Sequence, residues 1–194
     1  MTPATVPTRE KLLDAAEELV QTRGYNAFSF RDLAKRVGIR AASVHHYFPS
    51  KADLGRRLMD RYRRSFGEAL EAISSGARDP RRRLEKFVGL FRETLRRGDR
   101  LCMCGMLATE YATLPAGIRT EVRRFYGDSE AWLTDVFNEG RRTGRLRFAG
   151  KPAAAARTFF GALEGAMIAA RAFGDERRLA SAGQWLVQAL KTTA

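Results

Sequence analysis

Apolar residues recur along the chain at the three- and four-residue spacing of amphipathic helices. Between Thr8 and Arg23, for example, the apolar positions from Leu12 to Val20 fall on one face of a single helix. No segment of useful length shows the strict alternation of a half-buried strand. The pattern therefore predicts an all-α chain of nine helices, over residues 8–23, 31–37, 41–47, from 51 onward, from 80 onward, 101–114, 116–143, 152–173 and 175–192.

Capping residues support several of these boundaries. Ser29 precedes Asp32, and Ser50 precedes Asp53, with the spacing of a capping box, in which a hydroxyl and a carboxylate satisfy free backbone N–H groups. The pair Asp79-Pro80 supplies a cap followed by a proline, which suits the first helical position because no amide hydrogen is needed there. These local signals predict where three of the helices start.

Two short helices over residues 31–47, joined by a turn at Gly38-Ile39, have the arrangement of a helix-turn-helix. Leu33 and Val44 would lie on the buried side, which leaves the outer face of the second helix free to enter a major groove. Short Ala side chains there permit close approach to bases, and Arg, His, Ser and Lys side chains offer hydrogen bonds to bases or phosphates. Two short helices around a glycine turn also occur in proteins that bind no DNA, so this geometry leaves both readings open. The candidate DNA-binding residues are Ser29, Arg31, Arg40, Ala41, Ala42, Ser43, His45, His46, Tyr47 and Lys51.

The pattern of residues 8–54 resembles the TetR family of bacterial transcriptional regulators. The matching runs are Gly24–Ala34, Val37–Ile39 and Ser43–Leu54. The resemblance implies three N-terminal DNA-binding helices followed by a six-helix body that binds a ligand and dimerises. It thus implies a DNA-binding domain over residues 1–50 and a ligand-binding and dimerisation domain over residues 51–194.

The resemblance also implies individual DNA contacts. Ser43, Tyr47 and Lys51 match positions that contact phosphates in the family. Many family members have Ser or Thr where this chain has Arg40, and Tyr where it has His45. His45 retains a hydrogen-bond donor at a position that usually touches the DNA backbone, but the base sequence that the protein prefers does not follow from the resemblance.

Composition and charge change this picture in two ways. The two cysteines are two residues apart, so no disulfide framework is expected and a reducing, cytoplasmic location is favoured. The N-terminal residues lack the apolar core of a secretory signal, and the longest uncharged run is too short to span a membrane.

The formal net charge is +13, and the excess of basic residues lies mainly in the Arg-rich residues 56–100 rather than in the recognition segment. That excess favours a polyanionic partner.

The body of the predicted regulator contains a soft, polarizable segment around Cys102 and Cys104 that suits an adaptable apolar cavity. Aromatic residues of neighbouring helices can complete such a cavity, and Glu164 stands out as a carboxylate in an apolar stretch. A buried carboxylate needs a partner, so Glu164 is interpreted either as a ligand contact or as a residue paired across an interface. The candidate ligand-binding residues are Phe91, Cys102, Met103, Cys104, Met106, Leu107, Glu110, Tyr111, Phe125, Trp132, Phe160 and Glu164.

The two cysteines allow two interpretations. On a helix their side chains point in divergent directions, so a disulfide between them would be strained. The resemblance implies that some relatives sense electrophiles or oxidants through a cysteine near this position, and Cys102 is the better positional match. Alternatively, both cysteines are small buried apolar residues.

The last two helices are expected to form a homodimer interface. Gly161, Gly165 and Ala169 recur every four residues and leave a flat strip against which another helix can pack. Trp185 and Leu186 add bulk on the final helix. Two helices from each chain would make a four-helix bundle, and the two-fold symmetry would match a near-palindromic operator. The strip could instead pack only within its own chain.

Together these features predict a dimeric repressor that leaves its double-stranded DNA operator when a small apolar or thiol-reactive effector binds. An alternative is a ligand-independent module that binds nucleic acid or an anionic surface. No catalytic residues are expected, because no Gly-x-Ser-x-Gly, His-Glu-x-x-His or Walker-type motif is present. No cofactor or metal is expected either, since His45 and His46 are adjacent and point about 100° apart on a helix.

Overall fold

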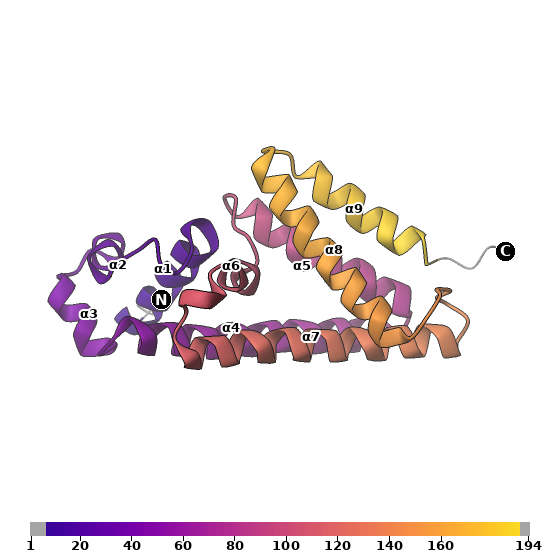
Figure 1. The fold of residues 1–194 in the computed structure, drawn as a ribbon, viewed down its shortest axis with the longest axis horizontal. Helices are drawn as coiled ribbons and strands as arrows, with labels where there is room; N and C mark the ends of the chain where they lie inside the picture. The colour runs from indigo at the N-terminus through magenta and orange to yellow at the C-terminus, as the bar shows by residue number, and fades with distance from the viewer. Residues whose placement is uncertain (1–6, 191–194) are drawn as a thin grey trace, which may run out of the picture. The chain divides into compact units, whose positions relative to one another are not determined.

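The computed structural model describes residues 7–190, and over this range it contains nine α-helices, one short 3-10 helix and no strand (Figure 1). The all-α, nine-helix prediction is therefore confirmed. The helices are α1 (Thr8–Arg23), α2 (Phe30–Val37), α3 (Ala41–Tyr47), α4 (Lys51–Gly76), α5 (Pro80–Arg96), α6 (Met103–Thr109), η1 (Tyr111–Thr113), α7 (Ala116–Arg142), α8 (Pro152–Ala172) and α9 (Arg177–Gln188).

The predicted capping groups start these helices. At the start of α2, the hydroxyl of Ser29 accepts a hydrogen bond from the amide of Asp32, and the Asp32 carboxylate accepts one from the amide of Ser29. The hydroxyl of Ser50 accepts a hydrogen bond from the amide of Asp53 in the first turn of α4. Asp79 caps α5 by accepting from the amide of Arg81. Short-range side-chain chemistry therefore sets these three helix starts.

Two predicted helices are shorter than expected. The helix predicted over residues 101–114 is divided into α6 and η1, because the chain turns at Glu110, which has φ −100° and ψ 10°. The last helix begins at Arg177 rather than at Asp175. The Asp175 carboxylate lies before the helix and accepts a hydrogen bond from the amide of Arg177. The predicted end of that helix, beyond residue 190, lies outside the described residues.

The chain divides into two compact units. The first contains residues up to 63 together with residues 103–123, and the second contains residues 64–102 and those from 124 onward. Helices α4 and α7 are each continuous from one unit into the other. The predicted division at residues 50 and 51 stays a prediction, because compactness places α6 and the start of α7 with the N-terminal helices.

Each unit has its own apolar core. In the first unit α1, α2 and α3 contribute fully buried side chains such as Leu12, Leu33 and Val44. In the second unit α8 and α9 lie side by side (Figure 1). Helix α9 also packs closely on α5, since a Cβ atom added at Gly183 would lie only 2.3 Å from a methyl group of Val88. The first core positions the outer face of α3, and the second core positions the outer faces of α8 and α9.

Candidate functional site

The predicted turn between α2 and α3 is present. Gly38 has the left-handed conformation, with φ 76° and ψ 35°, and its amide donates to the carbonyl of Ala34 at 2.9 Å. The amide of Ile39 donates to the same carbonyl at 3.0 Å, which ends α2 in the manner that glycine favours. Leu33 and Val44 are fully buried beneath the turn. The two short helices therefore form a helix-turn-helix with an apolar underside.

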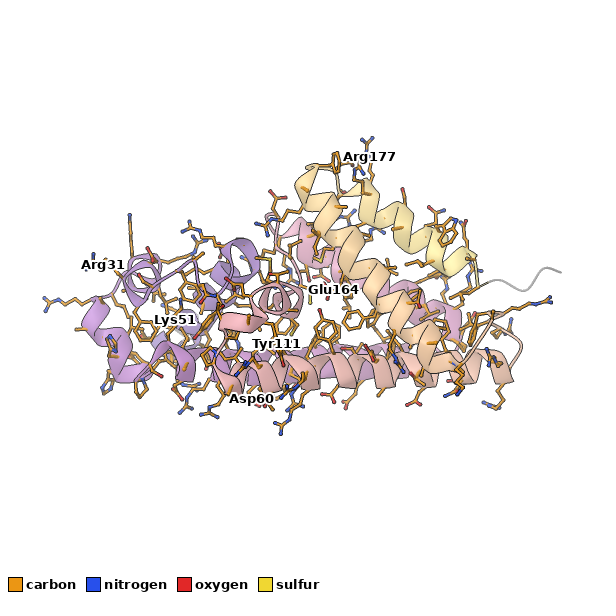
Figure 2. All side chains as sticks on the ribbon, viewed as in Figure 1. Arg31, Lys51, Asp60, Tyr111, Glu164 and Arg177 are labelled. Atoms are coloured by element: carbon orange, nitrogen blue, oxygen red, sulfur yellow. The ribbon has the colours of Figure 1, made fainter. Side chains whose placement is uncertain are left out.

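The opposite face of this motif is open to solvent. Arg31 at the start of α2 is exposed (Figure 2), and so is Arg40 just before α3. On α3 the side chains of Ser43 and Tyr47 are half-buried, and the remaining candidates are exposed, namely Ala41, Ala42, His45 and His46. The structure thus brings together most of the predicted DNA-binding residues on one accessible surface.

Four of these residues have contacts of their own within the motif. The ring of His45 packs edge-on against Phe30, with ring centroids 4.9 Å apart, and the ring of His46 packs against Tyr47 at 5.4 Å. The hydroxyl of Ser29 donates to the Asp32 carboxylate at 2.6 Å. Hydrogen bonds from Ser29 lower the pKa of Asp32 from its ordinary value. These contacts orient the start of α2 and the last turn of α3.

Lys51 has a different environment from the one that the family resemblance implies. Its ammonium group donates a hydrogen bond to the carbonyl oxygen of Phe28 and lies 4.7 and 4.4 Å from the ring centroids of Tyr25 and Phe28. Partial burial lowers the pKa of Lys51, against the opposing effect of nearby Glu110. The ammonium group therefore stabilises the N-terminal unit (Figure 2), and we leave it out of the proposed phosphate contacts. Cation–π attraction to two rings gives the physical reason for this inward position.

Glu110, which is predicted to contact a ligand, also binds the loop between α1 and α2. Its two carboxylate oxygens accept hydrogen bonds from the backbone amides of Tyr25, at 2.6 Å, and Asn26, at 3.1 Å. The side chain of Asn26 donates to the hydroxyl of Thr113 at 2.8 Å, which adds a second link to the same turn. Residues just after α6 thus hold the loop between α1 and α2, within the first unit.

The loop conformation makes this contact possible. Gly24 has φ 97°, a value that side chains rarely allow, and a Cβ atom added there would lie 2.9 Å from a carboxylate oxygen of Glu110. Burial and the charge of Glu110 raise the pKa of Tyr25 to about 12. The sequence holds no local signal for this pairing, because the partners are 84 and 85 residues apart.

The residues predicted to bind a ligand are divided between the two units. In the first unit, Met103, Cys104 and Leu107 are buried and Met106 is half-buried. The sulfur of Cys104 lies 4.0 Å from that of Met59. The hydroxyl of Tyr111 accepts a hydrogen bond from Arg123 at 2.9 Å. In this unit Cys104 and Tyr111 therefore have side-chain partners within the protein.

In the second unit, four predicted ligand residues belong to an aromatic cluster around Phe87. Trp132 stacks on Phe87 with ring centroids 5.6 Å apart, and its indole N–H donates to the hydroxyl of Ser74 at 2.9 Å. Phe160 and Phe91 also contact Phe87, at 6.0 and 5.4 Å. Phe125 joins the cluster through Phe160. These rings form the core of the unit.

Glu164 and Cys102 form a separate pair in the second unit. The thiol of Cys102, which is 3 % exposed, hydrogen-bonds the carboxyl group of Glu164. The Oε1 atom of Glu164 is buried and has no hydrogen-bond partner. Burial, and then the interaction with Cys102, raise the pKa of Glu164 well above its ordinary value. Of the predicted ligand residues, Glu164 is the one with a buried side-chain oxygen that has no hydrogen-bond partner.

The residues predicted to form a dimer interface lie on α8 and α9, and most of them are accessible. Gly161, Gly165 and Trp185 are exposed, while Ala169 and Leu186 are half-buried. Sequence reasoning missed two further apolar side chains on this surface, Ile168 and Phe173, which are 47 % and 67 % exposed. Ile168 follows the same helical spacing as the glycines, so the strip could have been extended from the sequence.

Other kinds of site find no support in the part of the chain that is described. No group of three or more potential metal ligands occurs among residues 7–190. Within the same residues, no helix combines the length and apolar character needed to span a bilayer.

Comparison with known proteins defines the class. The family model "Bacterial regulatory proteins, tetR family" matches residues 12–58, and the model "Tetracyclin repressor-like, C-terminal domain" matches residues 80–186. The chain therefore belongs to the TetR family of DNA-binding transcriptional regulators, which are not enzymes.

Individual relatives agree with this assignment. The transcriptional regulator AcuR of Cereibacter sphaeroides is 30% identical over 84% of this chain and 75% of its own length. The repressor NemR of Escherichia coli K12 is 26% identical over 84% of each chain. Among solved structures, a TetR family regulator from Agrobacterium tumefaciens superposes with a TM-score of 0.92 at 32% identity, covering 95% of this chain and 98% of its own. Reduced E. coli NemR superposes with a TM-score of 0.82 at 25% identity, covering 97% of this chain and 100% of its own.

The contact between Glu110 and the loop after α1 yields a first prediction. Glu110→Gln retains one acceptor oxygen but replaces the other with a donor, so one amide of the loop loses its partner. Hydrogen exchange at the amides of Tyr25 and Asn26 should become faster by about tenfold. Glu68→Gln, at an exposed position on α4, should leave these amides unchanged.

A second measurement on Glu110→Gln tests how the charge of the Glu110 carboxylate affects the pKa of Tyr25. Loss of the Glu110 carboxylate removes one cause of the raised pKa of Tyr25, so the pKa of that phenol should fall below about 12. Phenolate absorbance, assigned with Tyr25→Phe, measures it. Unchanged exchange rates together with an unchanged Tyr25 titration would contradict the described contact.

Proposed function

We propose that this regulator is a dimeric repressor that leaves its operator when a small apolar or thiol-reactive effector acts on its C-terminal unit. The exposed face of α3 above a fully buried underside is the observation that carries the DNA-binding part of this proposal. NemR, which resembles the chain over most of its length, is named as a transcriptional repressor. A repressor of this kind acts in the bacterial cytoplasm, where its operator lies.

In the proposed complex, α3 enters the major groove. Arg40 and His46 are exposed near its two ends and have free donors for base edges, while Ala41 and Ala42 allow close approach. Ser43 and Tyr47 are placed to contact phosphates, as the family pattern implies. Arg31 lies at the start of α2, where an exposed guanidinium adds charge attraction to the DNA backbone.

Operator binding explains the Arg-rich residues 56–100 better than binding to a general anionic surface does, because several of these arginines form ion pairs within the protein. Arg61 of α4 pairs with Asp14 at 2.7 Å and with Glu17 at 2.9 Å, both on α1. Arg57 pairs with Asp53 at 2.9 Å. Such pairs tie helices together and reduce the charge available to a membrane or to nonspecific nucleic acid.

The proposed dimer uses the strip on α8 and α9. Large apolar side chains that are exposed in a single chain, here Ile168, Phe173 and Trp185, are typical of a surface that is covered in the assembly. The flat positions Gly161 and Gly165 are open above, since a Cβ atom added at either would meet nothing within 4 Å. A second copy of the same two helices fits this surface as a four-helix bundle.

Effector action is proposed to reach the DNA-binding helices through α6. Cys102 directly precedes this helix, and Glu110 directly follows it. Glu110 in turn holds the amides of Tyr25 and Asn26 in the loop that leads to α2. A change at Cys102 that favours a different position of α6 would therefore disfavour the operator-binding arrangement, provided that the effector binds the two states with different affinity.

The DNA-binding proposal predicts different effects for two arginines. Arg40→Ala should change the preferred sequence at one position, because it removes a base-edge donor worth about 1–3 kcal/mol. Arg31→Ala should weaken binding to all duplexes and reduce the salt dependence of log affinity by about one. Selection from random duplexes and salt titrations measure these effects.

Lys51→Met serves as the control for the salt dependence. Its ammonium group is engaged by Phe28, so this variant should lose stability while its salt dependence stays close to that of the wild type. Identical effects of Arg40→Ala and Arg31→Ala would contradict the division of roles.

The dimer proposal predicts that Trp185→Asp yields a monomer, because a carboxylate would be placed in an apolar contact. Sedimentation equilibrium measures the mass. Ala131→Asp, at an exposed position on α7, should remain dimeric. A persistent dimer of the Trp185 variant would place the interface elsewhere.

A further inference from the structure

Two arginines in the first half of α7 lie around one tyrosine of η1. Arg123 donates a hydrogen bond to the hydroxyl oxygen of Tyr111 at 2.9 Å, and the guanidinium carbon of Arg119 lies 6.0 Å from the centroid of the same ring (Figure 2 labels Tyr111). Tyr111 and Arg119 are half-buried, and Arg123 is exposed. All three residues belong to the first compact unit. One phenol ring therefore holds two positive charges close together at the surface of this unit.

These two charges have no carboxylate partner in the described part of the chain. Within residues 7–190, neither arginine forms an ion pair. The carboxylate of Glu110, at the start of η1, is bound to the backbone of the loop after α1. Glu121, which lies between the two arginines in the sequence, pairs instead with Arg63 at 3.3 Å. Because like charges four residues apart on a helix repel each other, the arginine pair favours an anion between them.

The hydroxyl of Tyr111 adds a third donor to the same place. Its oxygen accepts the hydrogen bond from Arg123, and its own O–H group has no acceptor among residues 7–190. A phenol hydroxyl donates as well as accepts, and a guanidinium group has five N–H donors, so Arg123 retains donors beyond the one that Tyr111 uses. Two cationic donor groups and one neutral donor therefore surround a single position.

The charge and number of these donors define the ligand. A phosphate monoester carries about two negative charges at pH 7 and three strong acceptor oxygens, which is one oxygen for each donor group. Guanidinium groups match the geometry of phosphate oxygens well. A carboxylate or a phosphodiester carries one negative charge and has two such oxygens, so one donor of the site would lack a charged acceptor.

We propose that Tyr111, Arg119 and Arg123 form a binding site for small phosphate monoesters. Two terminal oxygens of the phosphate group accept hydrogen bonds from the guanidinium groups, and the third accepts from the hydroxyl of Tyr111. The ester oxygen points to solvent, so the site recognises the phosphate group rather than the alcohol that carries it. The proposed operator contacts and the proposed dimer interface include none of these residues.

The first experiment uses the full-length wild-type protein and a matched pair of probes, methyl phosphate and dimethyl phosphate. Each is titrated near pH 7 at constant ionic strength, and the NMR signals of the arginine Nε–H groups report binding. Methyl phosphate should bind more tightly by about tenfold or more, because the diester lacks one charge and one acceptor for a charge-assisted hydrogen bond. Equal affinity for the two probes would overturn the proposal.

Variants locate the site. Arg119→Gln and Arg123→Gln should each weaken methyl phosphate binding by about tenfold, because each removes a charge-assisted hydrogen bond. Tyr111→Phe keeps the ring beside Arg119 but lacks the O–H donor, and it should weaken binding by about threefold or more.

Arg142→Gln is the matched control, since this exposed arginine lies in the last turn of the same helix and its replacement removes the same charge. Its effect on methyl phosphate binding should be smaller than about twofold, because salt screens charges that lie far from the ligand. Equal weakening by Arg142→Gln and Arg123→Gln would attribute binding to the overall positive charge and would overturn the proposal.

Operator binding distinguishes a phosphate monoester from the DNA backbone as the ligand. An arginine that contacts a DNA phosphate contributes about one to the salt dependence of log affinity. Arg119→Gln and Arg123→Gln should therefore leave this salt dependence unchanged. A reduction by about one in either variant would assign that arginine to the operator and would overturn the proposed site.

Discussion

The arrangement of the N-terminal unit depends on the hydrogen bonds that Glu110 accepts from the backbone amides of Tyr25 and Asn26. Hydrogen bonds from amides to a carboxylate are stronger than those to a neutral acceptor, and here they join segments 84 and 85 residues apart. They hold the loop from which α2 starts, and so they set the base on which α3 is presented. Lys51 stabilises the same region through Phe28 and Tyr25.

In the proposed mechanism, this contact lies at one end of α6 and the proposed effector site lies at the other. Cys102 lies before its first residue, where the thiol meets the buried carboxyl group of Glu164. Glu110 lies after its last residue, where the carboxylate meets the loop after α1. In the proposed mechanism, α6 connects effector chemistry at Cys102 with the loop that Glu110 holds, because the helix backbone carries a displacement at one end to the other.

Sequence alone predicts the parts of this structure that local chemistry determines. The capping box at Ser29, the turn at Gly38 and the buried positions Leu33 and Val44 all follow from the sequence pattern, and all are present. The inward position of Lys51 does not follow, because it depends on two aromatic rings brought together only in the folded unit.

Tertiary contacts explain the remaining differences. The role of Glu110 depends on a loop far away in the sequence. The aromatic residues predicted to contact a ligand, such as Phe160, belong to a packed core, and their contact with a ligand stays a prediction. Glu164 stands out in the sequence because a carboxylate in an apolar stretch needs a partner, and the thiol of Cys102 is one such partner.

The most direct test of the account measures operator affinity in four samples: the wild-type protein and Glu110→Gln, each with Cys102 free and after addition of methyl vinyl ketone. If α6 connects the two ends, addition should weaken wild-type binding by about tenfold, within the range of typical allosteric coupling, and should have a much smaller effect in Glu110→Gln. The same loss of affinity in both proteins would contradict the account.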